Sequence, residues 1–264
     1  MISPAARFHA LHTGPGLLLL PNAWDAGSAR IIEAAGATAI ALSSAAVAWS
    51  MGWPDGDVLP VDLHLGVVER VVRRVSLPVS VDIEGGYAEE PEAVAETVRR
   101  FTGAGAVGIN IEDGSGAPEL LAKKIAAVRR AAVAEGVDLF INARTDVWLR
   151  GLAPGREHAE VVAREALYRD AGASGIFVPG ITDLEAITAL VAAVGLPLNV
   201  LARAALPGVA ALQAAGVRRL SAGSTIAETL GGATGTLAAA FLAGDTSGLF
   251  ASPLPYGKLN ELMQ

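Results

Sequence analysis

The chain has 264 residues, of which 52% are hydrophobic and 18% are charged, and its formal charge is −7. This composition supplies a large apolar core and argues against a nucleic-acid surface, which needs clustered Lys and Arg. The absence of cysteine excludes disulfides, thiolate catalysis and cysteine-ligated metals. Apolar runs such as Gly16 to Pro21 are too short to cross a bilayer, and the N-terminus does not resemble a signal peptide, so we expect a cytoplasmic protein without membrane contact.

Short runs rich in Val, Ile, Leu and Ala alternate with longer amphipathic stretches rich in Ala, Glu and Arg, a pattern typical of βαβ units. We expect eight strands, at residues 17–20, 39–43, 79–84, 107–112, 139–144, 175–178, 198–201 and 219–222. A helix is expected after each strand, at residues 26–35, 63–75, 91–104, 118–135, 157–171, 183–193, 208–215 and 225–242. This repetition favours a single α/β domain, a (β/α)8 TIM barrel, over an open doubly wound sheet, which usually carries a Gly-rich loop after its first strand. We assign the barrel to residues 1–245 and a C-terminal helical extension to residues 246–264.

Several of the predicted helices end in Ala-Gly-Ala or a similar triplet, with glycine at positions 36, 105, 172 and 216. Glycine adopts the left-handed conformation of a helix C-terminus at little cost. These positions are therefore expected to turn the chain from a helix into the next strand.

Acidic residues gather at the ends of the third and fourth predicted strands. In a barrel of this kind the active site lies at the C-terminal ends of the strands. Asp82 and Glu84 lie two residues apart in an apolar strand, which predicts that they share one face, and Glu112 ends the next strand. Three carboxylates without imidazole or thiolate nearby suit Mg²⁺ or Mn²⁺. The alternative is ion pairing with arginines or helix capping, but Arg144 alone cannot balance three carboxylates.

Arg144 ends a further apolar strand, and its planar guanidinium suits two-point binding of an anionic substrate beside the metal. An ion pair with Asp146 or Glu112 is the alternative, and the two roles are compatible. The aromatic segment at residues 48–57 is interpreted either as a mobile lid, in which Asp55 acts as acid or base, or as a rigid surface turn. No lysine ends a predicted strand, which argues against a Schiff-base aldolase.

Six segments, in this order, resemble the isocitrate lyase/phosphoenolpyruvate mutase superfamily. They are Pro21-Asn-Ala-Trp-Asp25, Leu42-Ser-Ser44, Gly52-Trp-Pro-Asp55, Val81-Asp-Ile-Glu-Gly-Gly-Tyr87, Gly108-Ile-Asn-Ile-Glu-Asp113 and Asn142-Ala-Arg-Thr-Asp146. The resemblance implies a (β/α)8 barrel that binds Mg²⁺ and a small 2-oxo carboxylate or its enolate. It also implies a homotetramer, with a homodimer as the alternative, in which a C-terminal helix is often exchanged between subunits; residues 250–264 are available for that role.

The resemblance assigns roles to individual residues. Asp82, Glu84 and Glu112 would hold the metal, largely through waters, while Asp55 would lie on the gating loop. Ser43 and the backbone amides of Ser44 and Ala45 would receive the substrate carboxylate, with Arg144 opposite. Trp24 is a further candidate for substrate binding, because the pocket's size and polarity depend on it.

The chain also departs from the family pattern. Isocitrate and methylisocitrate lyases carry a cysteine loop after the fourth strand, whereas here Asp113 to Glu119 run almost directly into a helix. Cleavage of isocitrate by the usual route is therefore not expected, and phosphorus chemistry, whose enzymes also use this loop, is not favoured. Asn199 is a candidate replacement for a lost substrate contact, with a structural asparagine as the alternative.

Together these features predict a Mg²⁺-dependent enzyme, with Mn²⁺ as the alternative ion. It would cleave a C–C bond of a small 2-oxo or 2-hydroxy carboxylate through an enolate, as a lyase or a hydrolase but not as a typical isocitrate lyase. Two other functions are the alternatives: a 2-oxo acid binding protein with little or no turnover, and P–C chemistry on phosphonopyruvate or phosphoenolpyruvate.

Overall fold

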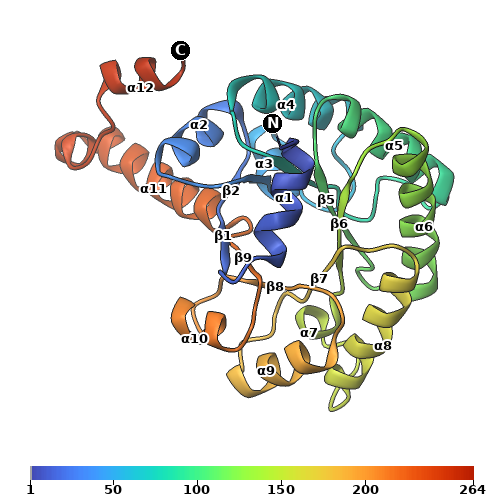
Figure 1. The fold of residues 1–264 in the computed structure, drawn as a ribbon. Coiled ribbons are helices and arrows are strands. Elements are labelled where there is room, and N and C mark those ends of the chain that lie inside the picture. Colours follow the sequence, from blue (N-terminus) through green and yellow to red (C-terminus); the bar gives the residue numbers. More distant parts are fainter. Residues whose placement is uncertain (1) are drawn as a thin grey trace.

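The computed structural model describes residues 2–264 and shows a barrel of parallel strands surrounded by helices (Figure 1). The strands are β1 (Leu18–Leu20), β2 (Asn22–Ala23), β3 (Ile40–Leu42), β4 (Val79–Asp82), β5 (Gly108–Glu112), β6 (Phe140–Arg144), β7 (Gly175–Phe177), β8 (Leu198–Leu201) and β9 (Arg219–Ser221). Their order in the sheet is β1-β9-β8-β7-β6-β5-β4-β3-β2.

β1 and β2 are two halves of one strand, separated only by Pro21. β1 pairs with β9 and β2 pairs with β3, so this divided strand closes the sheet into a ring. Proline has no N–H to offer to a neighbouring strand, which accounts for the interruption. The ring therefore has eight strand positions, and the predicted (β/α)8 barrel is confirmed.

The predicted helices all form, with ends within two residues of those expected. The helices are α1 (Pro4–Thr13), α2 (Ala26–Ala34), α3 (Ser44–Ser50), α4 (Val61–Arg74), α5 (Pro91–Gly103), α6 (Pro118–Ala134), α7 (Val147–Arg150), α8 (Glu157–Asp170), α9 (Leu184–Ala193), α10 (Val209–Ala214), α11 (Thr225–Leu242) and α12 (Tyr256–Leu262). A 3-10 turn, η1 (Ser247–Phe250), follows α11. α1, α3 and α7 were not anticipated. Within residues 2–264, no helix combines the length and apolar character needed to span a membrane.

The glycines that were expected to end helices do so. Gly36, Gly105, Gly172 and Gly216 have φ values of 96°, 104°, 104° and 89°. These are left-handed values that other residues rarely adopt. Each glycine turns the chain from a helix toward the next strand of the barrel.

α1 lies across the N-terminal end of the barrel (Figure 1). Phe8 and His12 of α1 contact Phe140 of β6, with the His12 and Phe140 rings stacked 3.9 Å apart between centroids. Phe8 and Phe140 belong to a buried apolar cluster with residues from β1, β3 and the start of β5. This end of the barrel is thus closed, and a ligand must enter from the other end.

A layer of polar side chains crosses the middle of the barrel. Asn142 donates hydrogen bonds to the side-chain oxygens of Asn110 (2.9 Å) and Asn199 (3.1 Å). The Arg219 guanidinium donates to Asn110 Oδ1 (3.2 Å) and to Ser221 Oγ (2.9 Å). Because buried polar groups need partners, this network fixes the side chains beneath the open end of the barrel.

α11 extends away from the barrel, and none of its residues is buried (Figure 1). The chain then returns, so that α12 lies against α2. Arg30 Nε donates to the carbonyl oxygen of Leu262 (2.7 Å), and Arg74 Nη1 donates to that of Met263 (3.3 Å). The C-terminal extension is therefore fastened to its own chain, whereas α11 packs mainly against η1 and has no buried residue.

Candidate active site

A cavity of about 190 Å³ opens at the C-terminal ends of the strands. It is lined by Asn22, Ser43, Ser44, Ala45, Asp55, Asp82, Asn110, Arg144, Leu149, Phe177, Leu201, Ser221, Gly223 and Ser224. Six predicted site residues are thus brought together: Ser43, Ser44, Ala45, Asp55, Asp82 and Arg144. The other four predicted residues, Trp24, Glu84, Glu112 and Asn199, do not line it.

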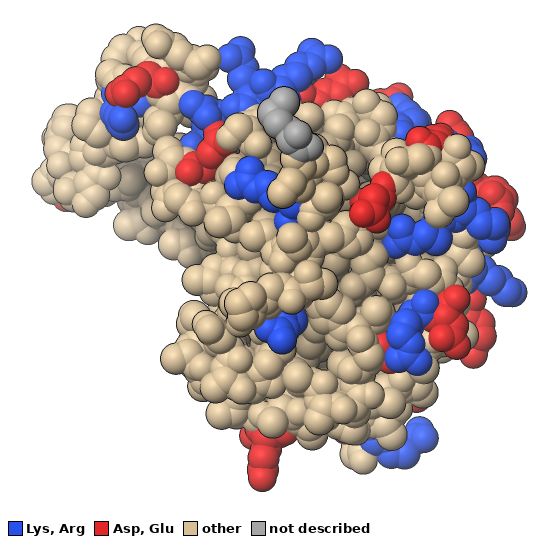
Figure 2. Space-filling view, viewed as in Figure 1, with Lys and Arg blue, Asp and Glu red and all other residues tan. Residues whose placement is uncertain are grey.

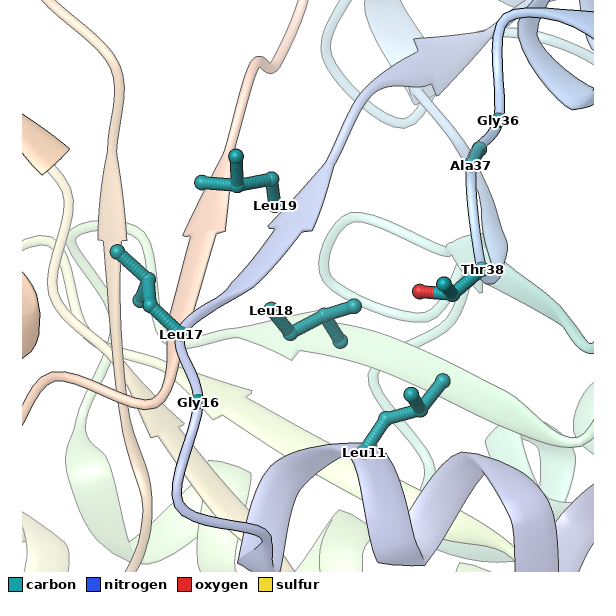
Figure 3. Close-up of a pocket in the computed structure, with 8 residues that line it drawn as sticks. All are labelled: Leu11, Gly16, Leu17, Leu18, Leu19, Gly36, Ala37 and Thr38. Carbon is teal, nitrogen blue, oxygen red and sulfur yellow. The ribbon is translucent and has the colours of Figure 1, made fainter.

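A larger hollow of about 410 Å³ lies beside α1, at the opposite end of the barrel (Figure 3). Leu11, Leu17, Leu18 and Leu19 line it together with Thr38 and small residues, and it has no titratable side chain. The chemistry therefore belongs to the smaller cavity, where acids and an arginine meet.

One side of the active-site cavity is formed where β3 passes into α3. Ser43 is the N-cap of α3, and its Oγ accepts a hydrogen bond from the Ala46 N–H (3.4 Å). The first amides of a helix have no partner within the helix, so those of Ser44 and Ala45 remain available to an anion. The carboxylate-binding role of this segment stays a prediction.

Asp82 and Asp55 supply two carboxyl groups to the cavity. Burial raises the pKa of Asp82, and the neighbouring Asp55 raises it further, while Arg144 and Arg219 lower it. Burial likewise raises the pKa of Asp55, against the effect of Arg144. Two acids that repel each other in a poorly hydrated cavity are stabilised by a proton or a cation.

Glu84 does not continue the strand alternation, because β4 ends at Asp82 and Glu84 has a φ of 53°. Its Oε2 accepts hydrogen bonds from the backbone N–H groups of Gly56 (2.9 Å) and Asp57. Burial raises the pKa of Glu84 to about 7, and the backbone N–H of Asp57 opposes this shift. Glu84 therefore holds the loop that carries Asp55, immediately behind the cavity.

The same loop also binds the turn after β4 through the side chain of Asp57. Asp57 accepts hydrogen bonds from the backbone N–H groups of Gly85 (3.2 Å) and Tyr87 (3.1 Å). Tyr87 in turn pairs through its hydroxyl with Nδ1 of the buried His64, at 2.8 Å. The proposed lid at residues 48–57 is thus closed in this structure, and its first residues, up to Ser50, belong to α3.

Arg144 is held by two carboxylates. Its Nη1 lies 2.5 Å from Glu112 Oε2, and its Nε and Nη2 donate to the oxygens of Asp146 at 2.7 and 3.1 Å. Burial raises the pKa of Glu112, and the guanidinium of Arg144 lowers it. The expected ion pairs with Asp146 and Glu112 are therefore both present, and Arg144 still lines the cavity.

A second set of contacts, which the sequence did not indicate, supports Asp146. Its backbone N–H donates to Asp113 Oδ1 (3.0 Å). Asp113 Oδ2 accepts from Arg164 Nη1 (2.8 Å) and from the Tyr168 hydroxyl (2.6 Å), both on α8. Arg164 and Tyr168 lie about twenty residues or more from Arg144 in sequence and belong to a helix, so no local pattern in the sequence links them to the site. Their effect is to fix the turn after β6.

Asn199 lies in the polar layer inside the barrel and is only 1% exposed. Its Nδ2 donates to the backbone carbonyl oxygens of Val200 (2.8 Å) and Arg219 (3.2 Å). This position fits the structural alternative, while a direct substrate contact stays a prediction. Trp24 is partly buried against the apolar core, and its role in substrate binding also stays a prediction.

Apolar residues of the cavity were missed altogether. Leu149, Phe177 and Leu201 reach it from α7, β7 and β8. In the sequence, an apolar residue at the end of a strand looks the same whether it packs in the core or faces a ligand. Only the fold separates the two.

The donor chemistry fits a hydrated divalent cation. Asp82 and Asp55 line the cavity, the charge of Asp82 acts on both Glu84 and Glu112, and Glu112 is the one of these four acids that pairs with Arg144 in the described structure. Across residues 2–264, however, no three His, Asp or Glu side chains are grouped closely enough to bind one ion directly. Mg²⁺ commonly keeps several waters, which suits such a set.

Comparisons with known proteins identify the family to which the chain belongs. A sequence model of the phosphoenolpyruvate phosphomutase family matches residues 8–242. An uncharacterised protein of Mycobacterium tuberculosis is 38% identical over 227 residues, which cover 82% of this chain and 81% of the relative. The 2-methylisocitrate lyase of Escherichia coli is 33% identical over 209 residues, covering 74% and 69%.

The fold is also found among solved structures. A Burkholderia cenocepacia protein provisionally named a phosphonomutase is 43% identical, with a TM-score of 0.84 over 91% of this chain and 98% of that one. Members of this group are lyases and mutases that act on small carboxylates. The match to the family extends over most of the barrel and includes each segment that lines the cavity. The chain belongs to the isocitrate lyase/phosphoenolpyruvate mutase superfamily of enzymes.

Proposed function

We propose that the protein is a Mg²⁺-dependent enzyme that cleaves a C–C bond of a small 2-oxo or 2-hydroxy carboxylate through an enolate. The observation that carries this proposal is the meeting of Arg144, Asp55 and Asp82 in one small cavity with Glu84 and Glu112 behind it. Breaking a bond next to a carbonyl leaves the electron pair on an enolate oxygen. The fixed guanidinium of Arg144, together with a divalent cation held by the carboxylates, would lower the energy of that state.

The substrate carboxylate would lie between the N-terminus of α3 and Arg144. Ser43 orients it, and the amides of Ser44 and Ala45 donate to it, while Arg144 donates from the opposite side. Arg144 needs no reorganisation for this role, because Glu112 and Asp146 already fix its guanidinium plane. A fixed donor stabilises developing charge better than a mobile one.

Asp82 would hold the metal, with Glu84 and Glu112 bound to it through waters. When bound, the metal supplies a Lewis acid that stabilises the charge of the enolate oxygen. Asp55 would hold a proton on its carboxyl oxygen and exchange it with the substrate, since burial has already raised its pKa. The closed loop that carries Asp55 keeps bulk water away from the enolate.

Isocitrate cleavage by the usual route is not proposed. The chain has no cysteine, and only Gly114 to Ala117 separate Asp113 from the start of α6. P–C chemistry on phosphonopyruvate or phosphoenolpyruvate is kept as a second reaction because the matching family model is that of a phosphomutase. A binding protein with the same site but without turnover is the alternative from a different class.

A substrate panel separates these functions. Substituted malates, methylisocitrate, oxaloacetate, the monocarboxylate 4-hydroxy-2-oxopentanoate and phosphonopyruvate are incubated with the full chain, with Mg²⁺ or with EDTA, and release of pyruvate, glyoxylate or phosphate is followed. We expect turnover of a C–C substrate with Mg²⁺ that EDTA and Asp82→Asn abolish, while Asp62→Asn, a surface control, leaves it unchanged. Phosphate release from phosphonopyruvate alone would favour P–C chemistry. Tight binding without any product would favour the binding protein.

We also propose that the chain forms a homodimer or homotetramer through α11. Leu230, Phe241 and Leu242 of this helix are 49%, 55% and 86% exposed. Figure 2 shows few charged side chains over α11 and the neighbouring side of the barrel. Leu19 of β1 is 49% exposed and lines an open apolar hollow with Leu220 of β9. An exposed apolar helix whose main contact is η1, and an exposed apolar side chain on β1 of the same chain, fit an exchange between subunits.

A further inference from the structure

One wall of the active-site cavity is apolar. Leu149, Phe177 and Leu201 line the same space as Arg144. Phe177 is 4% exposed, and its ring centroid lies 5.8 Å from the Arg144 guanidinium carbon. The cavity therefore passes from a charged end directly to a hydrocarbon surface.

Two glycines place the leucines of this wall. A Cβ at Gly180, whose φ is 95°, would lie 2.7 Å from the backbone nitrogen of Leu149, so α7 packs directly on this turn. A Cβ at Gly223, whose φ is 61°, would lie 2.7 Å from Leu201 Cδ1. At Gly180 the close neighbour is backbone, which fixes Leu149, whereas at Gly223 it is the end of the Leu201 side chain. The positive φ values favour glycine at both positions.

Arg144 is the only cation among the residues that line the cavity. Arg150, on α7, does not line it and is bound to Asp146 at 2.9 Å. Asp55 and Asp82 add negative charge to the lining. A second anionic group of a ligand at the apolar wall would thus meet hydrocarbon and no second cation, so its charge would be poorly stabilised there.

The hydroxyl groups near the apolar wall are already engaged. Ser221 Oγ accepts from Arg219 and lies 3.2 Å from Asn199 Oδ1, to which it donates. Ser224 Oγ donates to Glu228 at 2.6 Å. Among the described residues that line the cavity, the one cation is therefore Arg144, while Asn22 and Asn110 add only neutral amide groups.

We infer that the natural substrate is a monocarboxylate whose part beyond the bond that breaks is uncharged and ends in an apolar group, in contact with Leu149, Phe177 and Leu201. This inference rests on the proposed function, because it assumes that a 2-oxo or 2-hydroxy acid group binds beside Arg144. The volume of about 190 Å³ limits the apolar part to a short alkyl or alkenyl chain.

Isothermal titration of the full chain with Mg²⁺ tests the inference with a matched pair of acids. 5-Methyl-2-oxohexanoate and 2-oxoglutarate share the 2-oxo acid group and the two methylenes that follow it, but one ends in an isopropyl group and the other in a carboxylate of similar shape. We expect the apolar acid to bind at least tenfold more tightly, since each buried methylene contributes roughly a fourfold gain in affinity. Oxalate, which has no apolar part, is titrated with Mg²⁺ to measure binding beside Arg144 alone.

The variant Leu149→Arg adds a cation to the wall at a position that is 37% exposed, so the fold tolerates the charge. It should reverse the preference toward 2-oxoglutarate. Leu184→Arg on α9, where the leucine is 38% exposed and outside the cavity, should leave the preference unchanged.

The outcomes distinguish a failure of the proposed function from a failure of the substrate inference alone. If oxalate fails to bind with Mg²⁺, the proposed function fails and the inference fails with it. If oxalate binds but 2-oxoglutarate binds as tightly as the apolar acid, the inference alone is overturned. An unchanged preference in Leu149→Arg would also overturn it, because the wall would then not contact the ligand.

Discussion

Glu84 and Asp57 each bind the backbone of the other's loop. Glu84 Oε2 accepts the backbone N–H of Asp57, while the Asp57 carboxylate accepts the N–H groups that follow Glu84, those of Gly85 and Tyr87. The turn after β4 and the segment that carries Asp55 are therefore joined by reciprocal hydrogen bonds. This pairing keeps Asp55 over the cavity.

The first prediction concerns this pairing. Asp57→Gly removes the carboxylate but suits the local backbone, whose φ is 59°. The loss of two hydrogen bonds to a charged acceptor should cost about 2–3 kcal/mol locally. Hydrogen exchange of the Gly85 and Tyr87 amides should accelerate by more than tenfold. Asp57→Asn, which keeps one acceptor oxygen, should lie between this variant and the wild type; equal exchange in all three proteins would contradict a closed loop.

The second prediction is a pH dependence of stability in the absence of metal. The pKa of Glu84 is raised from 4.5 to about 7 by burial, so the folded state binds the proton more tightly than the unfolded state. Its contribution to stability is therefore fully present below pH 4.5 and is lost as the pH rises through 7, with a slope of at most about 1.4 kcal/mol per unit. Urea unfolding in EDTA between pH 4.5 and 7.5 measures this slope.

Glu84→Gln is the matched control for that titration, because it cannot lose a proton. Its slope over the same range should be smaller than that of the wild type. A wild-type slope that Glu84→Gln leaves unchanged would assign the titration to another group. Added Mg²⁺ should stabilise the wild type more at pH 7.5 than at pH 4.5, since the carboxylates are then ionised.

The third prediction concerns the support of Arg144 by α8. Tyr168→Phe removes the 2.6 Å hydrogen bond to the buried Asp113 and should lower the free energy of unfolding by about 1–2 kcal/mol. Arg164→Met leaves Asp113 without its cation and should cost about 3–5 kcal/mol. Both variants should also weaken the binding of oxalate with Mg²⁺, as the turn that holds Arg144 loosens.

Arg130→Met provides the comparison for these two variants. Arg130 pairs with Glu92 on the surface, with side chains 65% and 76% exposed. Its loss should change stability by less than about 1 kcal/mol and leave oxalate binding unaltered. If Arg164→Met behaved like Arg130→Met, the contacts of Asp113 would have no bearing on the site.

The fourth prediction concerns assembly. Light scattering coupled to size-exclusion chromatography should give a mass of two or four chains for the wild type. Leu230→Glu together with Phe241→Glu places charges on α11, which has no buried residue in the monomer, and should yield a folded monomer. Leu184→Glu on α9 should leave the mass unchanged. A monomeric wild type would contradict the proposed exchange of α11.

The sequence was sufficient for the barrel, because each strand and helix repeats a strong local pattern and glycines such as Gly105 mark the turns. It did not reveal the short helices α3 and α7, whose lengths of seven and four residues carry little periodicity. The division of the first strand at Pro21 was also missed. Proline occurs at the ends, edges and bulges of strands, so the sequence did not show that the strand continues beyond it.

The site was predictable in position but not in contacts. Strand ends brought Asp82 and Arg144 to one cavity as expected, whereas Glu84 turned to the loop because its backbone is left-handed. No pattern in the sequence reports such a φ in a residue other than glycine. The apolar wall was invisible for a different reason, because Phe177 looks like an ordinary core residue until the fold shows what lies in front of it.

The central claim, that this site forms an enolate with a metal, is tested most directly by hydrogen exchange on a 2-oxo acid. Pyruvate and 2-oxobutanoate are incubated with the full chain in D₂O, and proton NMR follows the signal of the C3 hydrogens. Formation of the enolate with Mg²⁺ should exchange these hydrogens for deuterium, and EDTA, Asp82→Asn or Arg144→Met should stop the exchange. Exchange no faster than in Mg²⁺ buffer without protein, in a sample that binds oxalate, would contradict the claim.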